Sequence, residues 1–377
     1  MKVVFTGGGT GGHFYPHIAV IEELQKSAIR VGVKDLSLFY FSTSAYNQDL
    51  LDKHGVVFKK IPAGKQRSYK SIKNFLDLWV VFYGLWVAVF KLFLLYPDVV
   101  FSKGGYAAFP TVFAARILAI PVVVHESDTI PGRVNKWTGK FAKKVAVSWP
   151  EAALLFPEEK TAVTGQPIRE EISTPVRDGA FQVLGFPADA DTRPTIAVFG
   201  GSQGAQAIND IILDILPELL KTYNVIHQTG PANYEDVSAR AEIILEKWEY
   251  IPYKAFPILG PEYMVRTAGV SDLIISRSGS FIFEMANWGI PAILIPLPED
   301  VSHDQRENAF SYARTGSASV IEQANLTPAI LQAEITKILN SELKKTMREN
   351  ALAFASLDAA IKISEAILNI AIEHDDV

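Results

Sequence analysis

The residues best suited to chemistry lie in a glycine-rich turn near the amino terminus, residues 7–13 with the sequence GGGTGGH. The turn follows an apolar run and opens a helical pattern, so it offers backbone N–H groups and a helix N-terminus to a phosphate. A helix N-terminus disfavours an imidazolium ion, so His13 should be neutral and able to accept a proton from a hydroxyl. The plainer alternative is that His13 caps or packs the turn.

Gly7, Gly9 and Gly12 satisfy the dinucleotide pattern G-x-G-x-x-G, but the next predicted strand ends without the acidic residue that would hold a ribose. The turn also lacks the lysine of a P-loop. A second glycine turn, at 200–204 with the sequence GGSQG, repeats the arrangement in the other half of the chain. Two such turns favour two ligands meeting in a cleft and disfavour a nicotinamide oxidoreductase.

Polar side chains follow several other predicted strands, at the edge where parallel sheets bind ligands. They lie at 104–106, 125–128, 276–284 and 303–308. Glu284 falls on the first turn of a helix, where it could accept hydrogen bonds from ribose hydroxyls or merely complement the helix dipole. The chain has no Cys, and its His and Asp spacing fits no familiar zinc pattern, so we expect no metal site.

Alternating apolar runs and helical patterns must position these groups. Strands are predicted at 3–6, 36–41, 98–101, 121–124 and 145–148, and again at 195–199, 224–227, 272–276 and 292–296. Alternation of this kind is typical of an α/β protein with parallel, doubly wound, Rossmann-like sheets. We predict two domains, 1–165 and 166–349, joined by a linker at 163–171, with terminal helices over 342–370.

Charge and hydropathy are distributed unevenly between the two predicted domains. Residues 1–165 carry 20 basic and 12 acidic side chains, whereas residues 166–377 carry 16 and 29, which indicates an anionic partner for the first half. Residues 76–96 are nearly all apolar and could form a transmembrane helix, a buried core helix or a helix at a membrane surface. A polybasic flank favours the third alternative, and it consists of Lys59, Lys60, Lys65, Arg67, Lys70 and Lys73.

Taken together, eight segments resemble the MurG family of inverting N-acetylglucosaminyltransferases, which have two Rossmann-like domains facing a central cleft (the GT-B architecture). The segments are 7–20, 102–110, 125–136, 163–171, 199–210, 276–284, 289–298 and 304–309. The resemblance implies transfer of N-acetylglucosamine from UDP-N-acetylglucosamine to the C4 hydroxyl of the muramyl sugar on undecaprenyl pyrophosphate, a step of peptidoglycan synthesis. It also implies that the helix at about 350–371 packs back on the first domain.

The resemblance also implies roles for individual residues. His13 matches the candidate base and Tyr106 the acceptor-side tyrosine, and substrate or donor binding falls to Thr10, Gly11, Gly12, Asp128, Arg169, Ser202, Glu284 and Gln305. The implied partners are UDP-N-acetylglucosamine, an undecaprenyl-linked lipid and an anionic membrane surface, with no cofactor, metal or nucleic acid. Since no leader pattern precedes the first strand, a peripheral location on the cytoplasmic face of the cell membrane is expected.

Two departures from the family pattern fall on the donor side. Asp128 stands where an asparagine is usual, and the loop that ends at Glu284 is one residue short and lacks a threonine. An ionised aspartate only accepts hydrogen bonds and repels a diphosphate. Alternatives are therefore a related transferase with another UDP-sugar or lipid acceptor, a nucleotide-sugar epimerase, or a binding module that has lost catalysis.

Overall fold

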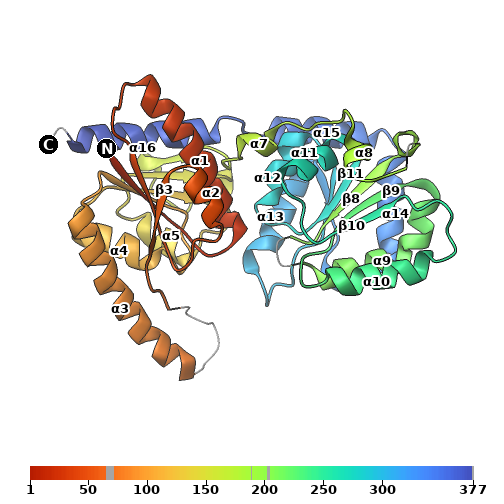
Figure 1. Cartoon of the computed structure of the whole chain (residues 1–377), viewed down its shortest axis with the longest axis horizontal. Coiled ribbons are helices and arrows are strands. Elements are labelled where there is room, and N and C mark those ends of the chain that lie inside the picture. The colour runs from red at the N-terminus through yellow and green to blue at the C-terminus, as the bar shows by residue number, and fades with distance from the viewer. Residues whose placement is uncertain (65–71, 188, 202–203, 376–377) are drawn as a thin grey trace. The chain divides into compact units, whose positions relative to one another are not determined.

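The computed structural model describes residues 1–64, 72–187, 189–201 and 204–375 (Figure 1). The chain divides into two compact units, Met1–Arg169 with Ser356–Val377 (unit 1) and Glu170–Ala355 (unit 2). Each unit contains a parallel sheet of its own with helices packed on it. The predicted α/β class with two Rossmann-like sheets is confirmed.

The sheet of unit 1 has the order β3-β2-β1-β4-β5-β6-β7, and all of its strands run parallel. The strands are β1 Lys2–Thr6, β2 Ser37–Ser42, β3 Val56–Lys60, β4 Val99–Ser102, β5 Val122–Glu126, β6 Lys144–Val147 and β7 Thr161–Val163. Residues of β4 and β5 are buried throughout, as expected for strands covered by helices on both faces. All the carboxyl ends therefore lie at one edge of the sheet.

The helices of unit 1 are α1 Gly11–Arg30, α2 Gln48–Lys53, α3 Ile72–Leu95, α4 Phe109–Ile117, α5 Arg133–Thr138, α6 Pro150–Ala153 and α16 Ala359–Asp375. The last of these, α16, packs along α1 although the two lie at opposite ends of the chain (Figure 1). Ile363 and Ile367 of α16 join Ile18 and Leu24 of α1 in one buried core. The carboxyl-terminal helix is thus a structural part of unit 1.

The sheet of unit 2 has the order β10-β9-β8-β11-β12-β13 and is also entirely parallel. Its strands are β8 Thr195–Phe199, β9 Asn224–Gln228, β10 Tyr253–Phe256, β11 Leu273–Ser276, β12 Ala292–Leu294 and β13 Ala318–Val320. The helices are α7 Glu170–Ser173, α8 Ala180–Val183, α9 Gln206–Thr222, α10 Tyr234–Leu245, α11 Pro261–Val270, α12 Phe281–Trp288, α13 His303–Arg314, α14 Pro328–Leu339 and α15 Leu343–Phe354.

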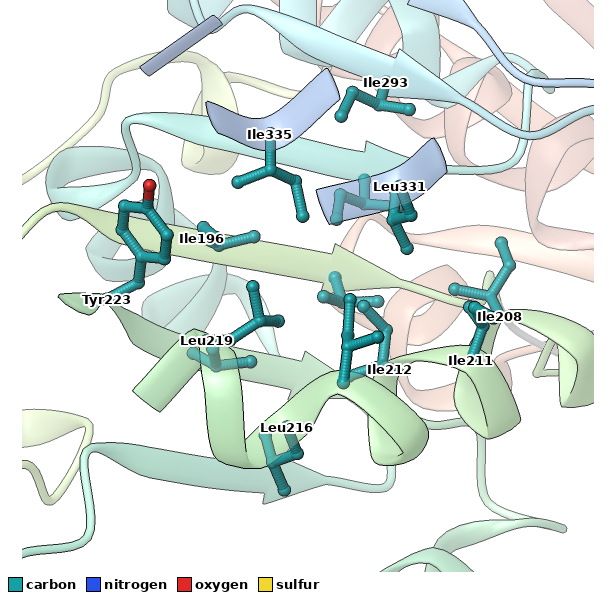
Figure 2. Packing of buried hydrophobic residues seen from close by; sticks show 14 of the residues in the cluster. Ile196, Ile208, Ile211, Ile212, Leu216, Leu219, Tyr223, Ile293, Leu331 and Ile335 are labelled. Atoms are coloured by element: carbon teal, nitrogen blue, oxygen red, sulfur yellow. The ribbon is translucent and has the colours of Figure 1, made fainter. Parts of the chain in front are cut away.

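The core of unit 2 forms between α9 and the sheet (Figure 2). Ile208, Ile212, Leu216 and Leu219 recur at helical spacing, so they share one face of α9, and that face packs over Ile196 of β8. Each of these side chains is almost fully buried, which contributes about 1.5–3 kcal/mol of hydrophobic free energy per side chain. This packing fixes the start of α9 relative to the end of β8.

The apolar segment predicted at 76–96 lies in α3, which packs one side against α4. Gly84 makes this position possible, because a Cβ there would lie 1.9 Å from the carbonyl oxygen of Pro62. The opposite side is exposed, and Trp86 retains 74% of its accessible surface. The buried-core interpretation of this segment is therefore wrong. Among the described residues, no helix combines the length and apolar character needed to cross a membrane.

Candidate active site

The first glycine turn connects β1 to α1 and lies at the carboxyl edge of the unit 1 sheet. No side chain fits at Gly8, because a Cβ there would lie 2.8 Å from Nδ1 of His13. The turn after β4 approaches from the side, since a Cβ on Gly105 would lie 3.1 Å from Cα of Gly8. Two glycine-containing turns thus meet beside the ring of His13.

His13 is held in the first turn of α1. Its backbone N–H donates to the carbonyl of Thr10 at 3.1 Å, and Oγ1 of Thr10 lies 3.2 Å from its Nδ1. Burial and, as the second cause, the positive charge of Lys103 lower the pKa of His13 to about 4. The ring is therefore neutral at pH 7, as the sequence predicted, and burial is the largest cause. A neutral imidazole with an accessible nitrogen can accept a proton from a hydroxyl.

Beneath the turns lies a buried polar network that sequence reasoning missed. Lys103 follows β4 and is only 2% exposed, and its Nζ donates to Nδ1 of His125 at 2.5 Å and to Oγ of Ser127. Oγ of Ser127 and Oγ of Ser148 donate to Oε1 of Gln166 at 2.9 and 3.0 Å. A lysine between a fully buried strand that is apolar up to Ser102 and two glycines was the available signal, because a charged residue in that context needs hydrogen-bond partners.

Glu126, the last residue of β5, shapes the loop that presents Asp128. Its Oε1 accepts from the backbone N–H groups of Ser127 and Asp128 at 2.8 and 3.0 Å. Its Oε2 accepts from the N–H of Gly132 at 3.0 Å and from Nδ2 of Asn135 at 2.9 Å. Burial and the nearby charge of Asp128 raise the pKa of Glu126 to about 7. The carboxyl group is enclosed by the loop it organises, and Asp128 itself is half-buried.

The other site residues predicted in unit 1 lie near the same edge. Thr10, Gly11 and Gly12 open α1, and Tyr106 follows β4 as an exposed side chain. Arg169 is buried, and its guanidinium carbon lies 4.0 Å from the ring centroid of Tyr15, as in a cation–π contact. The turns after β1, β4 and β5 therefore place Thr10, Tyr106 and Asp128 at one edge of the sheet.

The second glycine turn connects β8 to α9. Ser202 and Gln203 lie outside the described residues. Gly204 has a positive φ of 80°, and a Cβ there would lie 2.6 Å from the carbonyl oxygen of Thr229. Asn209 supports this region: its Nδ2 donates to the same carbonyl at 3.0 Å, and its Oδ1 lies 3.0 Å from Nε2 of His227. The backbone of the turn is thus packed directly against the end of β9.

Glu284 and Gln305 lie on neighbouring helix starts. Although the loop before Glu284 is one residue short of the family pattern, α12 begins at Phe281 and keeps Glu284, half-buried, in its first turn. Oγ of Ser278 donates to the carbonyl of Gln305 at 2.7 Å and so links the end of β11 to the first turn of α13. Oε1 of Gln305 accepts from the N–H of Leu297 at 3.3 Å. The structure therefore brings these two predicted residues to one edge of the unit 2 sheet.

Within the described ranges, no group of three or more His, Asp or Glu side chains is arranged to hold a metal ion. The chain itself supplies groups that can stabilise the charge of a phosphate. These are backbone N–H groups at the glycine turns, helix N-termini and Arg169.

Comparison with protein families gives two matches that together cover most of the chain. The N-terminal domain of glycosyltransferase family 28 matches residues 3–147, and the C-terminal domain of that family matches residues 195–368. Apart from Ser148, Gln166 and Arg169, the residues of both carboxyl-edge sites fall within these ranges.

Comparison with individual sequences gives matches over nearly the full length. A Bacillus cereus protein named UDP-N-acetylglucosamine--N-acetylmuramyl-(pentapeptide) pyrophosphoryl-undecaprenol N-acetylglucosamine transferase 2 is 36% identical over 369 residues, which cover 97% of this chain and 99% of that protein. A Clostridium kluyveri protein with the same transferase name, without the numeral, is 34% identical, with 97% and 98% covered.

Comparison with solved structures agrees with the family and sequence matches. The crystal structure of Acinetobacter baumannii MurG superposes with a TM-score of 0.74 at 26% identity, covering 98% of this chain and 99% of that one. A UDP-GlcNAc 2-epimerase from Neisseria meningitidis, bound to UDP-GlcNAc, superposes with a TM-score of 0.68 at 16% identity, covering 98% and 100%. The second likeness is one of fold alone.

Proposed function

The chain belongs to glycosyltransferase family 28, and we propose that it transfers N-acetylglucosamine from UDP-N-acetylglucosamine to the muramyl sugar of pyrophosphoryl-undecaprenol-linked N-acetylmuramyl-peptide. The substrates are those in the names of its near-full-length relatives. The observation in the structure that carries the chemistry is the position of His13 in the first turn of α1, beside two glycine turns and in surroundings that lower its pKa. A proton acceptor is what an acceptor hydroxyl requires before it can attack a sugar.

The reaction is a single displacement with inversion at the anomeric carbon. His13 removes the proton of the C4 hydroxyl of the acceptor while that oxygen forms a bond to C1 of N-acetylglucosamine. The bond between C1 and the diphosphate oxygen breaks, and UDP leaves with the bonding electron pair. Backbone N–H groups, a helix dipole and Arg169 stabilise the negative charge that develops on UDP.

We assign the remaining residues by the unit in which they lie. In unit 1, Thr10, Gly11 and Gly12 contact substrate, Asp128 faces the donor sugar, and Tyr106 lies on the acceptor side. In unit 2, Ser202, Glu284 and Gln305 bind the donor, and Glu284 accepts hydrogen bonds from the ribose hydroxyls. These assignments are supported by the position of the described residues at the carboxyl edges of their sheets, where α/β proteins bind ligands.

We propose further that α3 rests on the cytoplasmic face of the cell membrane. Its exposed side presents a run of large apolar and aromatic side chains, namely Trp79, Phe82, Tyr83, Trp86, Phe90, Phe93 and Leu94. The outer strand β3 adds the exposed cations Lys59 and Lys60. A surface that combines aromatic rings with cations suits an anionic bilayer, where each cation contributes about 1 kcal/mol. Lys65, Arg67 and Lys70 of the predicted basic flank lie outside the described residues, as does the side chain of Lys73.

A donor panel tests the proposed reaction. The full chain is incubated with UDP-N-acetylglucosamine, UDP-N-acetylgalactosamine or UDP-glucose, each with and without a lipid I analogue, and UDP release is measured. We expect release with UDP-N-acetylglucosamine only when the lipid is present. Preference for another sugar would reassign the donor and implicate Asp128, whereas conversion of the donor without acceptor would replace the transferase by an epimerase.

A further inference from the structure

Lys103 is the most unusual charged residue of unit 1. It is 2% exposed and follows β4 directly, whereas lysines normally keep their ammonium group in water. An ammonium ion removed from water costs several kcal/mol unless hydrogen bonds replace its hydration. Here Nζ donates to Nδ1 of His125 at 2.5 Å and to Oγ of Ser127. A buried ammonium group that depends on these hydrogen bonds is costly, so we looked for a function of Lys103 other than packing.

The partners of Lys103 show that it is the charged member of the network. Nε2 of His125 lies 3.0 Å from the carbonyl oxygen of Gly165, and a carbonyl only accepts, so Nε2 carries the proton. Nδ1 of His125 is then unprotonated, and its lone pair accepts a hydrogen bond from the ammonium group of Lys103. Burial, with the charge of Lys103 as the second cause, holds the pKa of His125 well below its usual range. The imidazole is therefore neutral and the lysine is positive.

The contacts of Lys103 join three separate segments of the chain. His125 and Ser127 lie at the end of β5, whereas Gly165 and Gln166 follow β7. Ser127 accepts from Lys103 and passes a hydrogen bond on to Gln166. The ammonium group thus holds the carboxyl end of β4 to the end of β5 and, through it, to the segment after β7.

Lys103 also stands close to the proposed base. A Cβ built on Gly7 would lie 3.4 Å from Cβ of Lys103, so Lys103 touches the glycine turn that carries His13. Two residues further along the chain, a Cβ on Gly105 would lie 3.6 Å from Cε1 of His13. The positive charge of Lys103 lowers the pKa of His13 in addition to the effect of burial.

Several other titratable groups face this region from neighbouring elements. On α1, His17 is fully buried, and its pKa is held well below its usual range by burial and by Lys103. At the end of β5 lie His125 and the carboxyl groups of Glu126 and Asp128. The pKa of Glu126 is raised to about 7, so part of its charge is absent at neutral pH. Among these charges, that of Lys103 is the one that disfavours a protonated His13.

We propose that Lys103 is a positioning residue whose buried ammonium group fixes the turns around His13 and places a positive charge beside that imidazole. The inference rests on the proposed function, because an uncharged ring matters only if His13 is the base. The two can nevertheless be tested separately, since the charge state of His13 is measurable without substrate.

The test measures the titration midpoint of His13 by NMR of histidine-labelled full-length protein, assigned with His13→Ala. Lys103→Gln removes the charge but keeps a hydrogen-bond donor, and Lys103→Met is a second neutral variant of similar length. We expect either change to raise the midpoint by roughly half to one pH unit, short of the usual value because burial remains. Lys103→Arg, which retains the charge, should keep the midpoint low. Lys143→Gln, an exposed lysine at the opposite end of the sheet, is the control.

The pH profile of kcat/KM provides the second readout. If the acid limb moves with the NMR midpoint, activity at pH 5 falls by up to about twofold, the loss approaches threefold to tenfold below pH 4, and activity at pH 8 is kept. A midpoint that moves without the acid limb supports the role of Lys103 and removes His13 from the reaction. A midpoint that stays in place in folded Lys103→Gln or Lys103→Met protein overturns the proposal.

Discussion

The two glycine turns occupy equivalent places, each between a strand and a long helix, but the residues packed beneath them differ. Each follows a buried strand, precedes a long helix and leaves no space for a side chain at a key glycine. Beneath the first turn lies a network with a cation and a carboxyl group, Lys103 and Glu126. Beneath the second lies a network of neutral groups, in which His227 joins Asn209 to the hydroxyl of Tyr253.

This difference indicates how one fold serves two tasks. A turn with exposed N–H groups binds a diphosphate without any ionisable side chain, so neutral support is sufficient in unit 2. A base can act only if its protonation state is controlled. Charged residues beneath the turn, such as Lys103, provide this control in unit 1. Under the function proposed above, unit 2 would bind an anionic donor without an excess of positive charge. If this comparison is right, substitutions in unit 1 should mainly change the rate of the reaction, whereas substitutions in unit 2 should mainly change donor binding.

The largest effect is expected from the base itself. His13→Ala should lower kcat by roughly 10²–10⁴-fold, because the acceptor hydroxyl loses its proton acceptor. UDP release with a lipid I analogue measures the rate, and calorimetry measures donor affinity, which should change little. His374→Ala, a half-buried histidine near the carboxyl terminus, serves as control. A His13→Ala enzyme that keeps full kcat would remove the chemical difference between the turns.

The next effect concerns binding in unit 2. Glu284→Gln should raise KM for the donor by roughly tenfold to a hundredfold and leave kcat much less affected, because a carboxylate that holds ribose hydroxyls contributes about 1.5–3 kcal/mol. Glu218→Gln, near the far end of α9 in the same unit, is the matched control. A fall in kcat with unchanged KM would show that Glu284 acts in the reaction rather than in binding.

A smaller effect concerns the surface of unit 1. Trp86→Ser on α3 should weaken binding to vesicles of phosphatidylglycerol and phosphatidylcholine by roughly fivefold to thirtyfold, since an exposed ring loses about 1–2 kcal/mol of apolar burial. Co-sedimentation measures this binding. Ile243→Ser, an equally exposed apolar residue on α10 of unit 2, should have no effect. Equal losses for both variants would refute a membrane role confined to unit 1.

A last prediction concerns stability and compares the residues packed beneath the two turns. Burial lowers the pKa of His13, His17 and His125 in unit 1 and of His227 in unit 2. Their unfolded forms bind a proton near pH 6.5, so each makes the folded state less stable as pH falls from there. Glu126 acts in the opposite direction between pH 7 and 4.5, because its raised pKa lets the folded form bind the proton first.

In unit 1, proton uptake by folded Glu126 offsets the effect of one of the three buried histidines, so a net effect of two histidines remains. In unit 2 the net effect is that of one histidine, His227. Between pH 6.5 and 4.5, unit 1 should therefore lose about 1.4 kcal/mol per pH unit more than unit 2. Hydrogen exchange resolved by peptide measures the opening free energy of each unit separately at pH 7 and pH 5. Equal pH dependence in the two units would mean that the charged network beneath the first turn is solvated in some other way.

The inner strands of both sheets could be predicted from the sequence, and the outer ones could not. β3, β7, β10 and β13 were not predicted, and among the described strands these are the outermost members of the two sheets. Inner strands such as β4 and β8 are buried throughout and form continuous apolar runs. The four outer strands are partly exposed, so their polar residues interrupt the pattern.

For the site, the sequence indicated the residues at the carboxyl edge but not those beneath them. Glycine spacing and the strand ends identified His13, Tyr106 and Glu284, because exposed polar groups after apolar strands form a local pattern. Lys103 and Gln166 were not predicted, because their roles depend on contacts between segments that are distant in sequence. The cause of the neutrality of His13 also required the fold, since burial cannot be seen in a turn alone.

The outer strands carry a further consequence for the behaviour of this protein in concentrated solution. An unpaired sheet edge is a template for strands of other molecules and so a route to aggregation. β3 carries Lys59 and Lys60, and β10 carries Lys254, whereas β7 and β13 have three residues each. Lysines and short length both oppose intermolecular strand pairing. The polar interruptions that concealed these strands in the sequence therefore protect the folded molecules from joining edge to edge.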